Sequence, residues 1–314
     1  MTGPSSAPDL SIVLVNWNAL DLTVDALTSI ADQTRGIEYE AFVVDNGSTR
    51  DRGLDELESK FPWVTLITNQ ENLGFGRANN QAFERASGRY VLALNTDTIQ
   101  VENALGEAVR YLDAHPEVGG LGIRHLNDDE TRSTQASAFR FPRPGQELLG
   151  LLGLRTPDDP TIWPDDDRGD VDADWLVGSF LMVRRETLDA VGVFDDRFFV
   201  YEEDIDWCRR ARTAGWVLRF RPALSMIHLG SASAPHIRDK SFMHFRSHLT
   251  YLRKHHGTVV AAAHYLAMVL RLTLAASWSG VKWLVGLETG AVFFPRCRRQ
   301  LEFLLLRPGQ RGLG

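Results

Sequence analysis

Four acidic side chains within five residues form the densest chemical feature of the sequence. Glu202, Glu203, Asp204 and Asp206 lie among aromatic residues, where an apolar run changes into a helix-like pattern. Like charges held close together in a partly dry place raise the pKa of at least one carboxyl group, which makes a general base one interpretation. The other is an acidic first helical turn in which Asp206 pairs with a following arginine.

Alternating strands and helices elsewhere in the chain can position such a site. Apolar, β-branched runs predict strands at residues 11–17, 41–46, 64–67 and 90–94, and apolar residues at helical spacing predict helices from 20 to 30 and from 75 to 86. This alternation predicts an α/β fold with a mainly parallel sheet flanked by helices. Because ligands of such sheets bind beyond the carboxyl ends of the strands, polar residues that follow strands are the candidates for a site.

Two aspartates follow predicted strands. Asp45, in an Asp-Asn-Gly-Ser turn, can accept a hydrogen bond from a nucleobase imide or a ribose hydroxyl, and Asp97 can hold a divalent cation against phosphate oxygens. Each aspartate can equally belong to a polar turn. The other candidates at strand ends are amides: Asn16, Asn18, Asn46, Asn72 and Asn95.

A glycine-rich segment precedes the predicted helix at 75–86. Its Gly74 and Gly76, together with Arg77 and Asn79, are consistent with a diphosphate held by backbone N–H groups and a guanidinium. The third glycine of the dinucleotide fingerprint is absent, so the segment does not predict a Rossmann cofactor site.

Regular patterning fades between residues 127 and 172, where prolines interrupt the sequence. A long segment of this kind is usually a lid, a binding loop or local disorder, and we expect a flexible segment on the acceptor side. Its acid cluster, Asp165–Asp167, is interpreted as solvated surface. Regularity returns with an apolar strand at 174–185, and another strand at 216–220 precedes His228. A lone histidine is more often a core or surface residue than a ligand.

Charge is divided unevenly along the chain. From His236 onward there are 12 Lys and Arg against 3 Asp and Glu, whereas the preceding residues hold 22 against 38. The division predicts an acidic soluble body and a basic tail that seeks an anionic surface. Because the tail is also apolar, we expect no nucleic-acid partner.

Two further features bear on the compartment. Residues 1–9 have no apolar core, so we expect a disordered N-terminus without a signal peptide or anchor, and a catalytic part in the cytosol. Cys208 and Cys297 lie far apart without metal-ligand spacing, which fits a reducing compartment and argues against a zinc site.

The C-terminal part predicts a basic, amphipathic helical extension. Residues 259–274 are mostly apolar, but His264 and Arg271 interrupt them, and no segment reaches the roughly 18 uninterrupted apolar residues of a spanning helix. Helices that lie in the membrane interface are favoured, and a homodimer interface is the alternative. The aromatic and basic residues behind this interpretation are Trp278, Trp283, Phe293, Phe294, Arg296, Arg298 and Arg299.

Four motifs in a fixed order carry a family resemblance. They are Val-Asn-Trp-Asn from residue 15, Val-Val-Asp-Asn-Gly-Ser from residue 43, Asn-Leu-Gly-Phe-Gly-x-Ala-Asn-Asn from residue 72 and Leu-Asn-x-Asp from residue 94. Each motif alone is degenerate. Together they resemble the glycosyltransferase family 2 enzymes, in particular their rhamnosyltransferase-like branch, over roughly residues 9–256. The resemblance implies a nucleotide-diphospho-sugar transferase (GT-A) fold.

The expected domain organisation follows from this resemblance. Residues 1–9 would be disordered, 10–235 would form the GT-A catalytic domain, and 236–314 would form the basic helical extension that associates with a membrane. Within the catalytic domain, residues 10–126 would be the nucleotide-binding half, 127–172 the flexible segment and 173–235 the acceptor and catalytic half.

The resemblance also implies roles for individual residues. Asp204 matches the aspartate of the family's Glu-Asp element and would remove the acceptor proton, while Glu203 would orient the acceptor or tune that pKa. Asp97, from the Asp-x-Asp element, and His228 would hold Mg²⁺ or Mn²⁺. Asn95 replaces the first aspartate of that element and so reduces the local charge. The donor would be bound by Asn16, Asn18, Asp45, Asn72, Gly74, Arg77, Asn79, Asn95, Asp97, Trp175, Gly178 and Ser179, although a core-strand role for Trp175 stays open.

The expected reaction is inverting, metal-dependent transfer of a hexose from a nucleotide-sugar donor, with dTDP-L-rhamnose favoured. The acceptor would be a hydroxyl of a polyprenyl-linked or cell-surface glycan in cell-wall or polysaccharide biosynthesis. The protein would then lie in the cytoplasm, peripherally on the inner face of the cell membrane. Another nucleotide sugar, or a non-catalytic nucleotide-sugar-binding scaffold subunit, are the alternatives. The joint presence of Asp204, Asp97 and His228 argues against the non-catalytic one.

Overall fold

The computed structural model describes residues 7–154, 158–164, 169–230 and 240–284, together with positions 289 and 298. The chain divides into two compact units, of which the first is 1–141 with 160–235 and the second is 142–159 with 236–314. Several residues weighed above lie outside the described residues, namely Asp165–Asp167, Phe293, Phe294, Arg296, Cys297 and Arg299.

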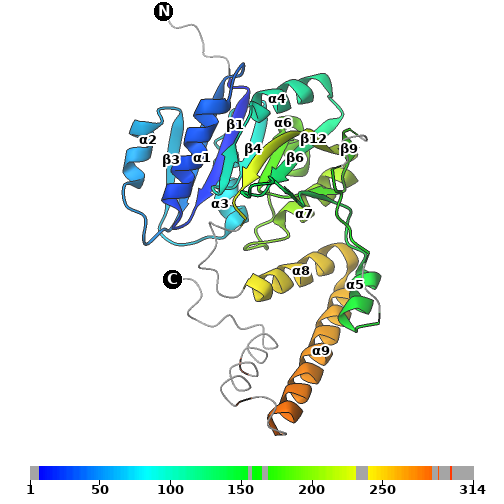
Figure 1. Ribbon diagram of the computed structural model, residues 1–314. Coiled ribbons are helices and arrows are strands. Elements are labelled where there is room, and N and C mark those ends of the chain that lie inside the picture. Colours follow the sequence, from blue (N-terminus) through cyan, green and yellow to red (C-terminus); the bar gives the residue numbers. More distant parts are fainter. Residues whose placement is uncertain are drawn as a thin grey trace, which may run out of the picture. The chain divides into compact units, whose positions relative to one another are not determined.

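The first unit is built on a ten-stranded sheet (Figure 1). One half is parallel and consists of β1 (Leu10–Asn16), β2 (Tyr39–Asn46), β3 (Val64–Asn69) and β4 (Tyr90–Leu94). The other half contains β5 (Thr98–Gln100), β6 (Val118–Leu126), β11 (Phe180–Arg184) and β12 (Val217–His228). The main strand order is β3-β2-β1-β4-β11-β6-β12-β5, and the remaining two strands, which are short and are described below, pair with β6 and with β12. Because β11 runs antiparallel to β4 and β6, and β5 antiparallel to β12, the sheet is mixed but mainly parallel, as predicted.

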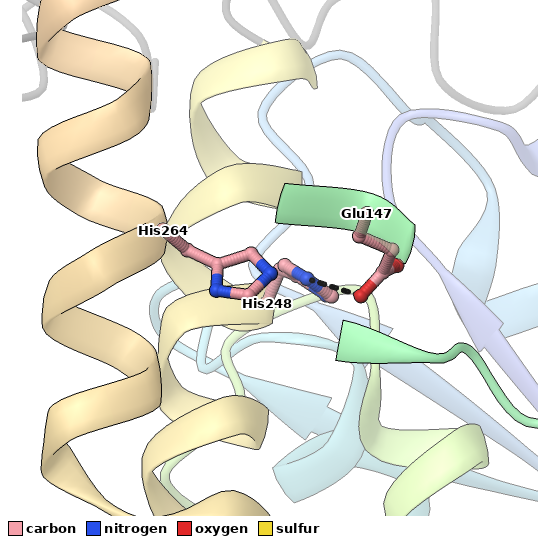
Figure 2. Close-up of side chains that lie close together, drawn as sticks. All are labelled: Glu147, His248 and His264. Carbon is pink, nitrogen blue, oxygen red and sulfur yellow. Dashed lines mark ion pairs between the residues drawn. The ribbon is translucent and has the colours of Figure 1, made fainter. Parts of the chain in front are cut away.

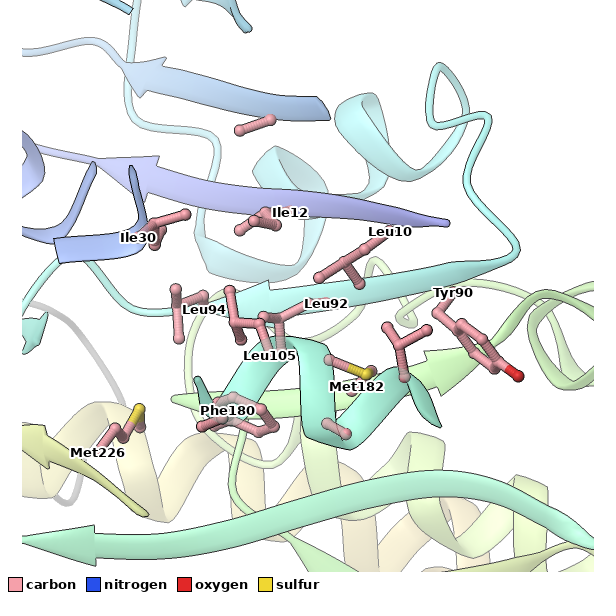
Figure 3. Packing of buried hydrophobic residues seen from close by; sticks show 14 of the residues in the cluster. Leu10, Ile12, Ile30, Tyr90, Leu92, Leu94, Leu105, Phe180, Met182 and Met226 are labelled. Atoms are coloured by element: carbon pink, nitrogen blue, oxygen red, sulfur yellow. The ribbon is translucent and has the colours of Figure 1, made fainter. Parts of the chain in front are cut away.

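Helices cover both faces of this sheet. The helices α1 (Leu20–Gln33), α2 (Leu57–Lys60), preceded by the 3-10 turn η1 (Leu54–Glu56), and α4 (Ala104–Ala114) pack on one face in an apolar cluster. Figure 3 shows this cluster around Leu10, Ile12 and Phe180. The helices α3 (Phe75–Phe83), α6 (Arg185–Val191) and α7 (Glu203–Thr213) contribute to the second cluster. Val13 belongs to that second cluster because successive side chains of a strand point to opposite faces.

Two segments differ from their predicted form. The apolar run at 174–185 is divided into β10 (Trp175–Leu176) and β11 by a turn that contains Gly178 and Ser179. The segment at 127–172 contains regular elements: β7 (Thr134–Gln135), β8 (Ala138–Phe139), α5 (Pro144–Leu151) and β9 (Val171–Asp172). These elements are too short for side-chain periodicity to reveal them in the sequence.

The second unit contains α5, α8 (Lys240–His256) and α9 (Thr258–Leu284), and α9 packs against the other two. Among the described residues, α9 is the one helix whose length and composition would allow it to cross a membrane. His264 and Arg271 therefore do not exclude a span, but a single helix of this kind is weak evidence for one. An extension that lies in the membrane interface stays a prediction.

Candidate active site

Helix α7 begins within the acidic stretch, at Glu203. The two residues before it, Tyr201 and Glu202, have φ angles of 68° and 70°. This left-handed conformation is uncommon for residues other than glycine, and such strain concentrates at functional sites. The turn places Glu203 and Asp204 in the first turn of the helix.

Asp204 is held by backbone N–H groups from two segments. Its Oδ2 accepts a hydrogen bond from Gly178 N at 2.8 Å, and its Oδ1 accepts one from Ile205 N at 2.8 Å. Burial raises the pKa of Asp204 to about 6, although these two hydrogen bonds oppose the rise. At neutral pH the carboxyl group is thus largely ionised, yet it is basic enough to accept a proton from a reacting hydroxyl.

The neighbouring acids are held differently. Glu203 is 5% exposed, and its buried Oε2 has no hydrogen-bond partner among the residues that the structure describes. Burial, followed by the charges of Asp204 and Glu202, raises the pKa of Glu203 well above its ordinary value. Asp206 is fully buried and accepts a hydrogen bond from Arg210 Nε at 3.0 Å, which confirms the predicted pairing with a following arginine.

The glycine-rich segment contacts the acidic stretch. Phe75 N donates a hydrogen bond to Phe199 O at 2.7 Å, and a Cβ added to Gly74, which has a φ of +90°, would lie 2.4 Å from that oxygen. Asn46 Nδ2 in turn donates to Asn72 Oδ1 at 3.0 Å and to Gly74 O at 3.2 Å. The end of β2, the glycine-rich segment and the loop before α7 are therefore one connected network.

Two further residues of this segment have protein partners. Asn79 Nδ2 donates to Phe75 O at 2.9 Å, while its Oδ1 is buried without a hydrogen-bond partner in the described part of the chain. Arg77 Nε lies 3.7 Å from Asp196 Oδ2, and both side chains are more than half exposed. The contact of Arg77 with a diphosphate stays a prediction.

The amides at the end of β1 order the loops around Asp45. Asn16 Nδ2 donates to Asp45 Oδ1 at 3.0 Å, to Ser48 Oγ at 3.2 Å and to Asp51 Oδ2 at 2.7 Å. Asn18 Oδ1 accepts two backbone N–H bonds from the loop after β2. The two amides thus help to fix the side chain that would contact the donor.

Asp97 and His228 lie together, as the resemblance implied, with His228 Nε2 3.5 Å from Asp97 Oδ1. Gln135 Nε2 donates to His228 O at 2.6 Å, which leaves Gln135 Oε1 to accept from His228 Nδ1 at 2.8 Å. His228 Nε2 then carries a lone pair that faces the carboxylate, and a cation between the two satisfies both. These residues fit a divalent ion. Nearby, Asn95 N donates to Ser179 O at 3.1 Å.

A second histidine near this pair was missed by the sequence analysis. The ring of His125 is buried at the end of β6, with its centroid 5.5 Å from that of His228 and its Nδ1 3.4 Å from Ser179 Oγ. Burial, with the neighbouring His228, lowers the pKa of His125 to about 3, so the ring is neutral at physiological pH. No sequence spacing connects it to His228; only the parallel pairing of β6 with β12 does.

Trp175 stacks on Phe139, with ring centroids 4.3 Å apart and planes 10° apart. It is partly exposed, in the short strand β10 that leads to the turn at Gly178. The stacking gives Trp175 a packing role in the structure, and its donor contact stays a prediction.

Comparisons with known proteins place this site in a family. The model of glycosyl transferase family 2 matches residues 11–161. The rhamnosyltransferase WbbL of Escherichia coli (strain K12) is 30% identical over 193 residues, which cover 58% of this chain and 70% of WbbL. The chain belongs to glycosyltransferase family 2.

Other members of the comparison agree with this family 2 assignment. An N-acetylglucosaminyl-diphospho-decaprenol L-rhamnosyltransferase of Mycobacterium tuberculosis (strain ATCC 25618 / H37Rv) is 29% identical over 204 residues, covering 59% of this chain and 65% of that relative's length. The mannosyltransferase PcManGT of Pyrobaculum calidifontis, solved with GDP-Man and Mn²⁺, superimposes with a TM-score of 0.57 at 18% identity, over 96% of this chain and 86% of that one. The family 2 chain has the predicted GT-A fold and resembles the rhamnosyltransferase-like members.

Proposed function

We propose that this family 2 chain is an inverting glycosyltransferase that moves L-rhamnose from dTDP-L-rhamnose to a hydroxyl group of a lipid-linked glycan. The observation that carries the catalytic part is the environment of Asp204. Two N–H groups orient its carboxylate, and burial raises the pKa of Asp204 to about 6. The choice of rhamnose is supported by the two relatives that are named as rhamnosyltransferases.

In the proposed reaction the acceptor oxygen attacks the anomeric carbon from the face opposite the leaving diphosphate. The new bond joins the acceptor oxygen to the sugar, the bond between the anomeric carbon and the phosphate oxygen breaks, and the configuration inverts. The acceptor proton passes to Asp204. Burial raises the pKa of Glu203, which disfavours a second negative charge beside this base, and in its protonated form Glu203 would donate a hydrogen bond to the acceptor.

Donor binding is assigned to residues that lie at the ends of strands of the sheet or follow them. Asp45, fixed by Asn16, would accept from the base or ribose. Asp97 and His228 would hold Mg²⁺ or Mn²⁺, which supplies positive charge against the leaving diphosphate. The neutral Asn95 contributes no charge there.

The acceptor class is supported by the C-terminal extension. On α9 the exposed side chains Leu266, Leu270, Leu274, Trp278 and Val281 recur every three or four residues, and this spacing makes one apolar face. Together with the basic tail, this face suits an anionic membrane surface, and an enzyme held there would meet a polyprenyl-linked acceptor.

Membrane contact is tested by co-sedimentation of the full chain with anionic liposomes. We expect binding that weakens as salt is added, because the basic residues contribute electrostatically. A chain that forms a concentration-dependent dimer and ignores liposomes would show that the apolar face serves a homodimer.

The activity is tested by screening nucleotide sugars for thermal stabilisation with and without Mn²⁺, followed by transfer assays with polyprenyl-linked acceptors. A ligand that binds only the native state raises its melting temperature, so dTDP-L-rhamnose should stabilise the chain and then yield an anomerically inverted product. Stabilisation by dTDP-L-rhamnose without transfer to any such acceptor would contradict the proposal and support the non-catalytic alternative.

A further inference from the structure

Three metal-ligand side chains converge in the second unit, whereas the residues assigned to catalysis belong to the first. Glu147 of α5, His248 of α8 and His264 of α9 each offer one ligand atom, and these atoms lie within 4.8 Å of one another (Figure 2). Among the described residues this is the one group of three or more His, Cys, Asp or Glu side chains with that geometry. It joins α5 to α8 and α9, two helices that follow each other in the chain about 90 residues after α5.

His264 is the deepest member of the group. Its side chain is 1% exposed, and its Nδ1 lies 2.9 Å from Val260 O, one turn earlier in α9. A carbonyl oxygen only accepts, so Nδ1 carries the hydrogen and Nε2 keeps its lone pair. This Nε2 is buried, and no residue in the described part of the chain forms a hydrogen bond with it. An imidazole fixed by one N–H bond to a carbonyl, with its other nitrogen bare, has the arrangement of a metal-binding histidine.

The distance between Glu147 and His248 fits two ligands of one metal ion better than it fits a direct hydrogen bond. Glu147 Oε2 and His248 Nε2 are 3.5 Å apart, and among the described residues this buried oxygen has no hydrogen-bond partner. An N–H···O bond would bring the atoms to about 2.7–3.2 Å. Ligand atoms at about 2.0–2.1 Å from a tetrahedral zinc are about 3.3 Å from one another. An ion pair between Glu147 and His248 would also not explain why the buried Nε2 of His264 points to the same place.

We propose that Glu147, His248 and His264 bind a divalent transition metal, zinc by preference. Two imidazoles and one carboxylate are ligands that zinc accepts in tetrahedral geometry, with water completing the site. Magnesium prefers oxygen ligands and octahedral geometry, so it fits poorly. The ion would fasten α5 to α8 and α9. The site uses no cysteine, and for this reason the spacing of the cysteines could not reveal it.

The test uses the full chain, stripped with EDTA and then titrated with Co²⁺, which reports tetrahedral coordination by intense visible absorption. We expect one such Co²⁺ per chain, displaced by Zn²⁺, and a higher melting temperature with Zn²⁺. Glu147→Gln and His264→Asn should weaken binding by more than the roughly 10- to 100-fold typical of losing an outer-shell partner. His244→Asn, at an exposed position of the same α8, and Asp97→Asn should retain the absorption.

Three results would overturn the proposal. They are the absence of tetrahedral Co²⁺ and of zinc-dependent stabilisation in the parent chain, absorption that persists unchanged in Glu147→Gln, and absorption lost in Asp97→Asn. Glu147 is partly exposed, so Glu147→Gln keeps the test decisive even if removal of the buried His264 prevents folding.

Discussion

The start of α7 and the Asp97–His228 pair are two charged regions of one site, assembled in opposite ways. In the first, the acids are adjacent in sequence, and their partners give them different properties: Asp206 pairs with Arg210, whereas Asp204 accepts hydrogen bonds from two backbone N–H groups. In the second, distant residues are brought together by the pairing of β12 with β5, which sets His228 opposite Thr98. The properties of the acids at α7 thus depend on local burial. The closeness of Asp97 and His228 depends on the register between β12 and β5.

The largest expected effect lies at α7. Asp204→Asn removes the proposed base, so kcat should fall by roughly 10²- to 10⁴-fold. Donor-dependent thermal stabilisation should persist, because Asp204 is assigned to the acceptor side. A folded, donor-binding variant whose kcat stays within a few-fold of the parent would remove Asp204 from the mechanism.

The metal pair should respond in a different measurable quantity. Asp97→Asn or His228→Gln should raise the Mn²⁺ concentration needed for half-maximal activity by well over tenfold, and Gln135→Ala, which frees the ring of His228, by roughly 10- to 100-fold. Activity titrations with Mn²⁺ measure this. Identical titration curves for the parent and all three variants would separate Asp97 and His228 from metal binding.

The contact between the glycine-rich segment and the loop before α7 should contribute to the free energy of unfolding. Gly74→Ala places a Cβ against Phe199 O in a left-handed conformation, so we expect a loss of about 1–3 kcal/mol in the free energy of unfolding. Gly145→Ala, in α5, meets nothing within 4 Å and should be neutral or slightly stabilising. Denaturant unfolding of both variants checks this, and equal stabilities would contradict the close contact.

Glu203 should produce the smallest effect, one that depends on pH. Its folded-state pKa is raised, so the stability it contributes is fully present below the unfolded-state pKa of about 4.3 and is lost as pH rises through the folded-state value. Glu203→Gln cannot ionise. Its melting temperature relative to the parent should therefore increase as the pH rises above the unfolded-state value of about 4.3. A difference that is constant with pH would show that Glu203 is not held in a raised-pKa environment.

The sequence predicted those parts of the fold whose residue pattern extends over several neighbouring positions. The strands β1 to β4 and the start of α7 were found because apolar periodicity and acid clustering are local signals. The break between β10 and β11 was not, because Gly178 and Ser179 interrupt an apolar run whose composition still favours a strand.

The residues of the candidate site likewise differ in how far the sequence could predict them. The motif resemblance supplied Asp97 and His228, and the structure brings them together. His125 carries no local signal, because its place depends on β6 pairing with β12. Asn16 was expected at the donor, yet its Nδ2 bonds three side chains of the protein, which no sequence spacing indicates.

The central claim is that Asp204 is the base that accepts the acceptor proton. The most direct test is the pH dependence of kcat/KM, which reports ionisations of the free enzyme. Because the base must be ionised, kcat/KM should rise with pH through a midpoint of about 6 and then level off, and the residual activity of Asp204→Asn should lack this rise. A rise with the same midpoint in Asp204→Asn, or a parent profile that is flat through pH 6, would contradict the assignment.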